Sequence, residues 1–171
     1  MNIFIAGIHG VGKSYLASRT ADKISMVHTS ASKLIKQERT LASWNDDKRV
    51  SNVDANQCAL VAAVRRHNEG GVKLLLDGHF VLLNESGEMI RLNEDVFAKL
   101  NLKQVILIEA EPQIVARRIA LRDQRQVNLD HLISFLLAER EQAKSVCEKL
   151  GIPLAILLSP SEEEFITAVL G

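Results

Sequence analysis

Residues 7–14 have the types and spacing of a phosphate-binding loop. They match every fixed position of the pattern G-x-x-x-x-G-K-[ST]. Glycines adopt backbone angles closed to other residues, so such a loop can point successive N–H groups at phosphate oxygens. Lys13 would then reach the β- and γ-phosphates of ATP, and the Ser14 hydroxyl would ligate Mg²⁺. The predicted nucleotide-binding residues are Gly7, His9, Gly10, Val11, Gly12, Lys13, Ser14 and Tyr15.

The loop lies between a predicted strand and a predicted helix. Residues 2–6 form an apolar run typical of a strand buried on both faces, and residues 15–24 favour a helix. The N-terminus of that helix would add a partial positive charge, which favours bound anions. This order of elements is the context that a nucleotide-binding loop requires, and it favours that interpretation over a chance glycine turn.

Apolar runs alternate with helical patterns along the rest of the chain, which predicts a parallel sheet with helices on both faces. We therefore expect one α/β domain, residues 1–171. Its fold would be the three-layer P-loop NTPase sandwich, with a five-stranded parallel sheet in the order 2-3-1-4-5. The predicted strands are residues 2–6, 26–29, 72–76, 105–108 and 154–158. The predicted helices are residues 15–24, 30–40, 54–68, 94–100, 111–123, 130–150 and 161–170.

Local signals mark several helix ends. Pro112 occupies a tolerated first-turn position, and Gly151 is expected to end the helix of residues 130–150. Ser161 and Glu164 have the spacing of a capping box. Between the third and fourth strands, residues 84–88 predict a polar turn.

The composition argues against several classes of function. Lys plus Arg and Asp plus Glu both number 21, so we expect neither nucleic acid nor a membrane surface as a partner. No apolar run approaches the roughly 18 residues of a spanning helix. We expect no signal peptide before the first strand and a cytoplasmic location. Cys58 and Cys147 lack metal-ligand spacing and are expected to be reduced core thiols. The sequence leaves the oligomeric state open.

Asp77 ends the apolar run of residues 72–76, and P-loop proteins hold Mg²⁺ through such an aspartate. We therefore predict that Ser14 and Asp77 organise the metal, the alternative being that Asp77 and Gly78 only form a turn. His79 follows at the same sheet edge. It could contact the substrate or simply be a hydrogen-bonded loop histidine. His9 is expected to shape the loop rather than to react.

Three arginines are candidates for a clamp on the transferring phosphoryl group. Arg118 and Arg122 lie on the helix of residues 111–123, and Arg140 lies in the apolar stripe of the following helix. A planar guanidinium group suits phosphate recognition. The alternative is a structural ion pair, with Glu139 or Asp123 as the partner of Arg140. The predicted catalytic residues are Lys13, Asp77, Arg118, Arg122 and Arg140.

With these residues in place, the chain resembles the nucleoside-monophosphate kinases, most closely the compact archaeal-type adenylate kinases. The likeness covers nearly the whole chain and rests on Gly7–Ser14, His28–Lys36, Asp54–Gln57, Leu76–His79, Glu111–Arg122 and Arg140. It implies a monophosphate-binding arm at about residues 30–69 and a short lid at about residues 118–140. The implied substrate-binding residues are Ser30, Lys36, Gln57, Gly78 and His79.

The chain also departs from that family. No arginine closely follows Asp77 and Gly78, where many members grip the acceptor phosphate; Lys36 or Arg91 could replace it. The lid has no cysteines for zinc. Trp44, the only tryptophan, would either cover the core edge or form a wall of the base-binding pocket.

The leading hypothesis is an ATP-dependent kinase of a nucleoside monophosphate, with AMP as the first candidate. Its acceptor is already anionic, so transfer requires positioning and charge stabilisation but no general base. A second hypothesis is a kinase of a small hydroxyl metabolite, with Asp77 or His79 as the base. A third is a regulatory ATPase that acts through a protein partner.

Overall fold

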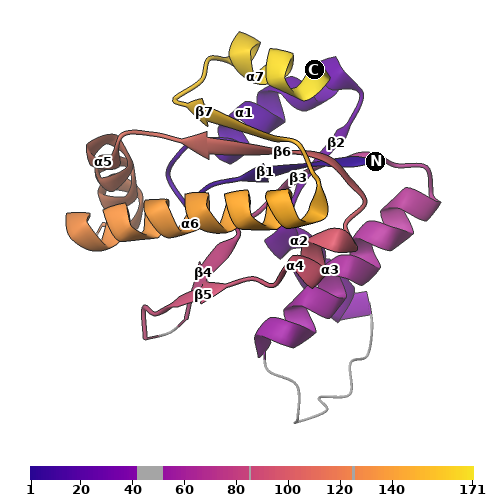
Figure 1. Ribbon diagram of the computed structural model, residues 1–171, viewed down its shortest axis with the longest axis horizontal. Coiled ribbons are helices and arrows are strands. Elements are labelled where there is room, and N and C mark those ends of the chain that lie inside the picture. Colours follow the sequence, from indigo (N-terminus) through magenta and orange to yellow (C-terminus); the bar gives the residue numbers. More distant parts are fainter. Residues whose placement is uncertain (42–51, 85, 125) are drawn as a thin grey trace.

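The protein is an α/β sandwich built on a five-stranded sheet in the order β2-β3-β1-β6-β7, with every pairing parallel (Figure 1). This is the predicted 2-3-1-4-5 order, and it is confirmed. The computed structural model describes residues 1–41, 52–84, 86–124 and 126–171; Trp44 and Arg125 lie outside them. The strands are β1 Asn2–Ala6, β2 Val27–Ser30, β3 Leu74–Asp77, β6 Leu102–Glu109 and β7 Leu154–Leu158.

Helices cover both faces of this sheet, as the alternation of elements predicts. They are α1 Lys13–Thr20, the 3₁₀ helix η1 Ala21–Ile24, α2 Ala31–Leu41, α3 Asn52–Glu69, α4 Glu94–Ala98, α5 Pro112–Asp123, α6 Leu129–Leu150 and α7 Glu162–Leu170. Within the described part of the chain, none of these helices has the length and apolar character needed to cross a membrane.

The side chains of β1 alternate between two hydrophobic cores because successive strand residues point to opposite faces. Ile3 and Ile5 pack in a core with residues of α1, α5, α7 and the first half of α6. Phe4 and Ala6 pack in the other core with residues of α2, α3, α4 and the second half of α6. The central strand therefore contributes to both layers, and α6 spans the two.

The predicted helix ends are present. Pro112 is in the first turn of α5, and Gly151 ends α6 in the left-handed conformation, with φ 63°. Ser161 and Glu164 form the predicted capping box of α7. Two asparagines add caps: Asn93 accepts a hydrogen bond from the backbone of Asp95, and Asn128 accepts one from the backbone of His131.

The structure adds an antiparallel hairpin that the sequence analysis predicts only as a turn. Its strands are β4 Val81–Leu83 and β5 Met89–Arg91, and they form a separate two-stranded sheet. The turn itself is present at the predicted place, where the Glu88 N–H donates to Asn84 Oδ1 at 2.8 Å. Strands of three residues give a periodicity too short to recognise from sequence.

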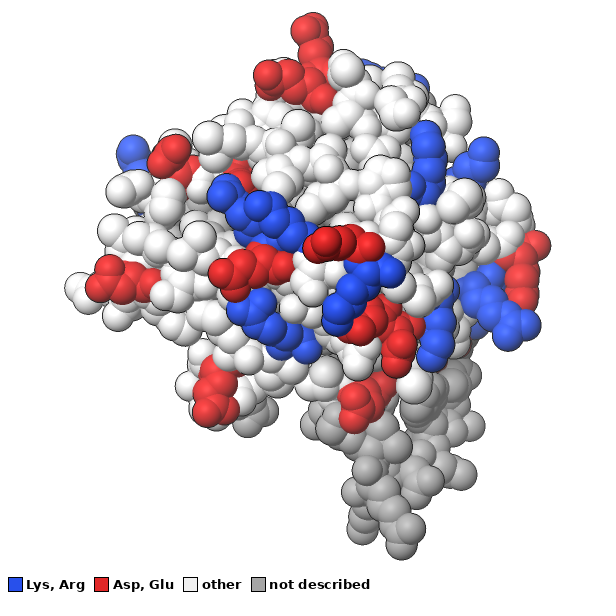
Figure 2. All heavy atoms as spheres, viewed as in Figure 1, with Lys and Arg blue, Asp and Glu red and all other residues white. Residues whose placement is uncertain are grey.

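Charges of both signs lie side by side on the face that α6 crosses (Figure 2). Ion pairs connect α6 to its neighbours: Arg91 of β5 pairs with Glu141 at 3.0 Å, and Lys149 pairs with Glu94 of α4 at 3.0 Å. These pairs are largely exposed, so each stabilises the fold only slightly. Specific pairing, and not a field of a single sign, characterises this face.

Gly78, directly after β3, lies against a cluster of aromatic rings. Phe4 packs edge-on against both Phe80 and Phe97, with ring centroids 5.4 Å apart in each pair. Phe80 and Phe97 stack at 4.3 Å. A Cβ atom on Gly78 would lie 2.6 Å from Cζ of Phe4, well inside van der Waals contact. Only glycine lets the chain pass over this ring.

We expect the substitution Gly78→Ala to destabilise the protein by about 1–3 kcal/mol, because the new methyl group must displace a fully buried ring. The free energy of unfolding in urea measures the effect. Gly70→Ala is the matched control: the Cβ atom there would meet its nearest neighbour at 3.4 Å, so we expect little change. Equal unfolding free energies for the two variants would contradict this account.

Candidate active site

The glycine-rich loop connects β1 to α1 with the backbone angles that glycine permits. Gly12 precedes α1 with φ 108°, and Gly7 leaves β1 with φ 136°. A Cβ atom on Gly7 would collide with the Ile108 carbonyl oxygen of the neighbouring strand β6. Gly7 is buried beneath the loop and does not line either of the cavities described below. Gly7 therefore supports the conformation of the loop and does not face either cavity.

Lys13 is folded back onto the loop. Its ammonium group donates to the carbonyl oxygens of Gly7, at 2.6 Å, and Ile8, at 3.1 Å. Burial lowers the pKa of Lys13, and the nearby carboxylates of Asp77 and Glu139 oppose that shift. The ammonium group is thus held in a pre-formed position among the loop carbonyls.

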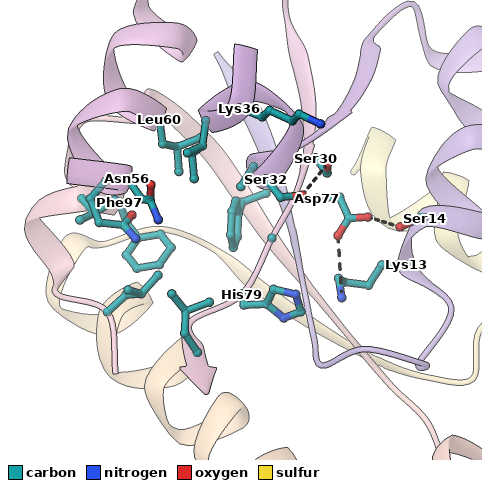
Figure 3. Close-up of a pocket in the computed structure, with 18 of the residues that line it drawn as sticks. Lys13, Ser14, Ser30, Ser32, Lys36, Asn56, Leu60, Asp77, His79 and Phe97 are labelled. Carbon is teal, nitrogen blue, oxygen red and sulfur yellow. Dashed lines mark hydrogen bonds and ion pairs between the residues drawn. The ribbon is translucent and has the colours of Figure 1, made fainter. Parts of the chain in front are cut away.

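Asp77, at the end of β3, lies next to Ser14, its predicted partner at the metal, and next to Lys13. Ser14 Oγ donates a hydrogen bond to Asp77 Oδ2, and Lys13 Nζ lies 3.8 Å from Oδ1 (Figure 3). Burial alone would raise the pKa of Asp77, but contacts with His28, Lys13 and Ser14 outweigh it and keep the pKa below its usual value. An ionised carboxylate beside a hydroxyl is the hard oxygen donor set that Mg²⁺ prefers. The residues thus fit a magnesium ion, and the metal role of Ser14 and Asp77 stays a prediction.

A cavity of about 800 Å³ opens from this carboxylate toward α2, α3 and α4. Lys13, Ser14, Asp77 and His79 lie at one end, and Asn56, Leu60 and Phe97 lie at the other (Figure 3). All five residues that the sequence analysis predicts to bind the substrate line it: Ser30, Lys36, Gln57, Gly78 and His79. The cavity is charged at the end near the loop and mostly apolar at the far end.

The sequence analysis missed Ser32, Arg39 and Asn56, which line the same cavity. Ser32, Lys36 and Arg39 are four and then three residues apart on α2 and share one helix face, which is a signal the sequence contains. Arg39 Nη1 donates to Asn56 Oδ1 at 3.0 Å and so connects α2 to α3 across the cavity wall.

Two buried polar atoms in this cavity lack a hydrogen-bond partner among the described residues. They are Gln57 Oε1 and His79 Nδ1. The His79 ring lies 4.5 Å from the His9 ring. Burial, together with the positive charge of Lys13, lowers the pKa of His79 to about 3. His79 is therefore neutral at physiological pH, and both unpaired atoms are available to a ligand.

A second cavity, of about 560 Å³, lies on the other side of the loop. The predicted nucleotide-binding residues line it, apart from Gly7: His9, Gly10, Val11, Gly12, Lys13, Ser14 and Tyr15. Arg118 lies over this loop and donates to the carbonyl oxygens of Gly10, at 3.0 Å, and Val11, at 3.3 Å. Ser159 and Pro160, which follow β7, complete the wall and are further residues that the sequence analysis missed.

The three predicted clamp arginines do not all lie together. Arg122 lines the second cavity with Arg118, and its guanidinium group contacts its neighbour Asp123 at 2.6 and 3.0 Å. Arg140 lines neither cavity. It forms an ion pair with Glu109, at the end of β6. The alternative interpretation of Arg140 as a structural ion pair thus matches its position, but its partner is Glu109 rather than Glu139 or Asp123.

Arg91, one of the two candidates to replace the acceptor arginine, also lies elsewhere. It pairs with Glu141 and does not line the cavity between Asp77 and α3. Lys36, the other candidate, lines that cavity.

Glu139 of α6 is a buried carboxylate whose role the sequence analysis missed. It accepts hydrogen bonds from the backbone N–H groups of Gly7 at 3.1 Å, Phe80 at 2.9 Å and Val81 at 2.7 Å. Burial raises its pKa, while these N–H groups and Lys13 act in the opposite direction. One side chain thus connects the first residue of the loop to the segment after Asp77. The sequence around Glu139 gives no sign of this role, because glutamates commonly flank the apolar positions of a helix.

The parallel sheet, the glycine-rich loop between β1 and α1, and the carboxylate at the end of β3 define a kinase-like P-loop fold that binds a nucleotide. The chain belongs to the AAA domain family, whose sequence profile matches residues 6–134. The comparison with curated proteins finds no match.

Solved structures with a similar fold include three metabolite kinases. A sugar kinase from Janibacter sp. HTCC2649 is 15% identical, with a TM-score of 0.56 over 99% of this chain and 91% of that one. A gluconokinase from Sinorhizobium meliloti 1021 is 13% identical, with a TM-score of 0.55 over 97% and 87%. The shikimate kinase from Aquifex aeolicus vf5 is 14% identical, with a TM-score of 0.55 over 99% and 94%. At these identities the similarity shows the fold alone.

The neutral state of His79 leads to a prediction of how the free energy of unfolding depends on pH. Its pKa falls from an ordinary value of 6.5 to about 3 on folding, so the unfolded chain binds a proton that the folded chain does not. The stability that His79 contributes is therefore complete above pH 6.5 and is lost as the pH falls toward 3. Between pH 6.5 and pH 5 we expect a loss of roughly 2 kcal/mol from this residue.

Urea unfolding of the protein and of a His79→Gln variant at pH 7.5 and pH 5 measures this loss. Glutamine does not titrate, so the variant should lose less stability on acidification than the unsubstituted protein. An identical loss in both proteins would show that His79 is not the group responsible.

Proposed function

We propose that the protein transfers the γ-phosphoryl group of MgATP to a nucleoside monophosphate. One observation carries the proposal. Among the described residues that line the 800 Å³ cavity, Asp77 is the sole carboxylate, and it is already engaged by Ser14 and Lys13. His79 also lines the cavity, but with its pKa lowered to about 3 it is a weak base. A cavity with cations and no free carboxylate suits an acceptor that is already ionised, such as a monophosphate.

The donor phosphates would lie on the loop, as the P-loop pattern and its backbone geometry support. Lys13 would leave the carbonyl oxygens of Gly7 and Ile8 and turn to the phosphates, and Arg118 and Arg122 would offset charge from the second cavity. Bound between Ser14 and Asp77, Mg²⁺ would neutralise charge on the β- and γ-phosphate oxygens.

The acceptor would place its phosphate near Asp77 and its base at the far end of the cavity. Lys36, Arg39 and the hydroxyl groups of Ser30 and Ser32 are suited to the phosphate. Phe97 and its apolar neighbours are suited to a flat ring. In this proposal residues 30–69 act as the monophosphate-binding arm and residues 118–140 as a short lid over the donor, and together they exclude water during transfer.

A coupled assay with ATP and a panel of monophosphates, with AMP first, tests this function. Transfer to at least one of them, lost in a Lys13→Ala variant, is the expected result. ATP binding without transfer to any monophosphate would refute the proposal, and the absence of transfer to hydroxyl metabolites as well would favour the regulatory ATPase.

A second candidate is a kinase of a small hydroxyl metabolite, which the similarity in fold to the gluconokinase and the shikimate kinase favours. A hydroxyl group must lose its proton, and Asp77 is the described carboxylate within the cavity that could accept it. Transfer to sugars or sugar acids but to no monophosphate, abolished in an Asp77→Asn variant that still binds Mg²⁺ with ATP, would favour this candidate.

Lys36 gives a sharper test of the acceptor position. Its loss should raise the KM for the monophosphate about tenfold or more and leave the KM for ATP unchanged, because it would contact only the acceptor phosphate. Lys33→Ala is the matched control, since Lys33 is exposed on the same helix and does not line the cavity. Equal effects of Lys36→Ala and Lys33→Ala on the KM for the acceptor would show that Lys36 does not contact the acceptor phosphate.

A further inference from the structure

The strand β7 lies at one border of the five-stranded sheet, and its outer side carries free backbone groups (Figure 1). Within the described part of the chain, β7 pairs only with β6. The residues that flank the strand, Pro153 and Ser159, both form backbone hydrogen bonds with β6. Every second residue of a parallel strand bonds to the same neighbour. Leu154, Ile156 and Leu158 therefore direct their N–H and C=O groups to the free side.

The side chains of β7 do not protect this edge. All five residues of the strand are apolar, and Ile156 and Leu158 are 39% and 61% exposed. Proteins usually guard an exposed edge with charged residues, proline or a bulge. The strand contains no charged residue or proline, and its register with β6 is unbroken. The strand at the opposite border, β2, is shorter and mostly polar. The edge of β7 is thus the one suited to pairing with another strand.

The described residues leave room beside this edge. A groove of about 580 Å³ lies between β7 and the helix α7. Ile156, Leu157 and Leu158 line it on the strand side, and Glu163 and Thr167 line it on the helix side. An added strand would therefore meet an open apolar surface beside the free backbone groups of β7.

A second copy of β7 complements this edge when the two strands run antiparallel about a two-fold axis. With Ile156 of each copy opposite the other, Leu154 of one lies opposite Leu158 of the other, and Ala155 lies opposite Leu157. Every cross-strand pair is then apolar, and such pairs stabilise a sheet. The two copies of Ile156 would exchange both of their backbone hydrogen bonds. The same surface is used on both copies, so the assembly closes at a dimer.

The charges at the two ends of β7 favour the antiparallel arrangement. Glu163 is exposed in the first turn of α7 and lines the groove. Lys103 is exposed on β6, two residues before Val105, which pairs with the first residue of β7. Neither side chain forms an ion pair with another residue that the structure describes. Antiparallel pairing brings the acidic end of one copy to the basic end of the other, which favours association.

The exposed apolar surface continues from the strand onto α6. Leu158 is the register partner of Glu109, which pairs with Arg140 of α6. Leu137 lies one helical turn before Arg140 and is 51% exposed. This continuation matters because two short strands alone give a small contact, and a specific interface buries at least about 1,000 Å² in total.

We propose that β7 pairs with β7 of a second copy of this chain, so that the two five-stranded sheets continue into each other across a two-fold axis. This inference goes beyond the proposed function and does not depend on it. No residue of β7 lines either cavity beside the phosphate loop. Dimerisation can therefore be tested without substrate and without phosphoryl transfer.

Sedimentation velocity over a series of concentrations tests the dimer. The unsubstituted protein should change from the monomer mass to twice that mass as its concentration rises. Ile156→Lys should remain a monomer, because a lysine on an edge strand opposes pairing. The matched control is Val27→Lys, at a 51% exposed position of the opposite edge strand β2, and it should dimerise like the unsubstituted protein. A monomer mass for the unsubstituted protein from nanomolar to submillimolar concentration would overturn the inference, whether or not the variants fold.

Cysteine cross-linking tests the surface and the register. In the proposed pairing the two Ile156 Cα atoms lie about 5.5 Å apart, which is within the span of a disulfide. Ile156→Cys should therefore form a covalent dimer on oxidation. The exposed Cys58 is first replaced by serine, and Cys147 is buried. Val27→Cys in the same background is the control and should stay monomeric. Cross-linking of Ile156→Cys no faster than that of Val27→Cys would overturn the inference, even for a protein that dimerises through another surface.

Discussion

The geometry of the site depends on the buried carboxylate of Glu139. Its oxygens accept hydrogen bonds from the backbone N–H groups of Gly7, Phe80 and Val81. Gly7 belongs to the glycine-rich loop, and the other two residues belong to the segment that follows Asp77. Without that acceptor, the backbone donors would be buried and unpaired, at a cost of about 1–3 kcal/mol each. The helix α6 therefore fixes the spacing between the loop and the carboxylate of Asp77, although it contributes no residue to the cavity between Asp77 and α3.

The fold could be predicted because its signals are local. Apolar runs of strand length, the glycine-rich loop and the helix caps each lie within a few residues, and the strand order follows once they are assigned to a P-loop sandwich. The cavity residues Ser30, Lys36 and Gln57 could be predicted from the resemblance. Contacts between distant segments could not be predicted, because sequence spacing carries no information about them. Two examples are the hydrogen bond from Gly7 to Glu139 and the ion pair of Arg140 with Glu109.

The charges of the site are arranged so that the cations lie where the phosphates would be. Lys13, Arg118 and Arg122 surround the loop, while the pKa values of His9 and His79 are both lowered, chiefly by desolvation and then by the charge of Lys13. The half-buried ring of His79 therefore lies beside the lysine without adding charge. Charge stabilisation is then left to groups on the donor side, which is the side where negative charge develops during phosphoryl transfer.

The central position of β1 has a consequence for how the protein is made. On the ribosome, β1 emerges before both of its neighbours: it gains β3 only after Asp77 and β6 only after Glu109. Such long-range pairings slow folding and leave apolar strands uncovered meanwhile. The anchor of the phosphate loop arrives later still, since Glu139 follows Gly7 by 132 residues. The loop is therefore synthesised well before the segments that give it its final shape.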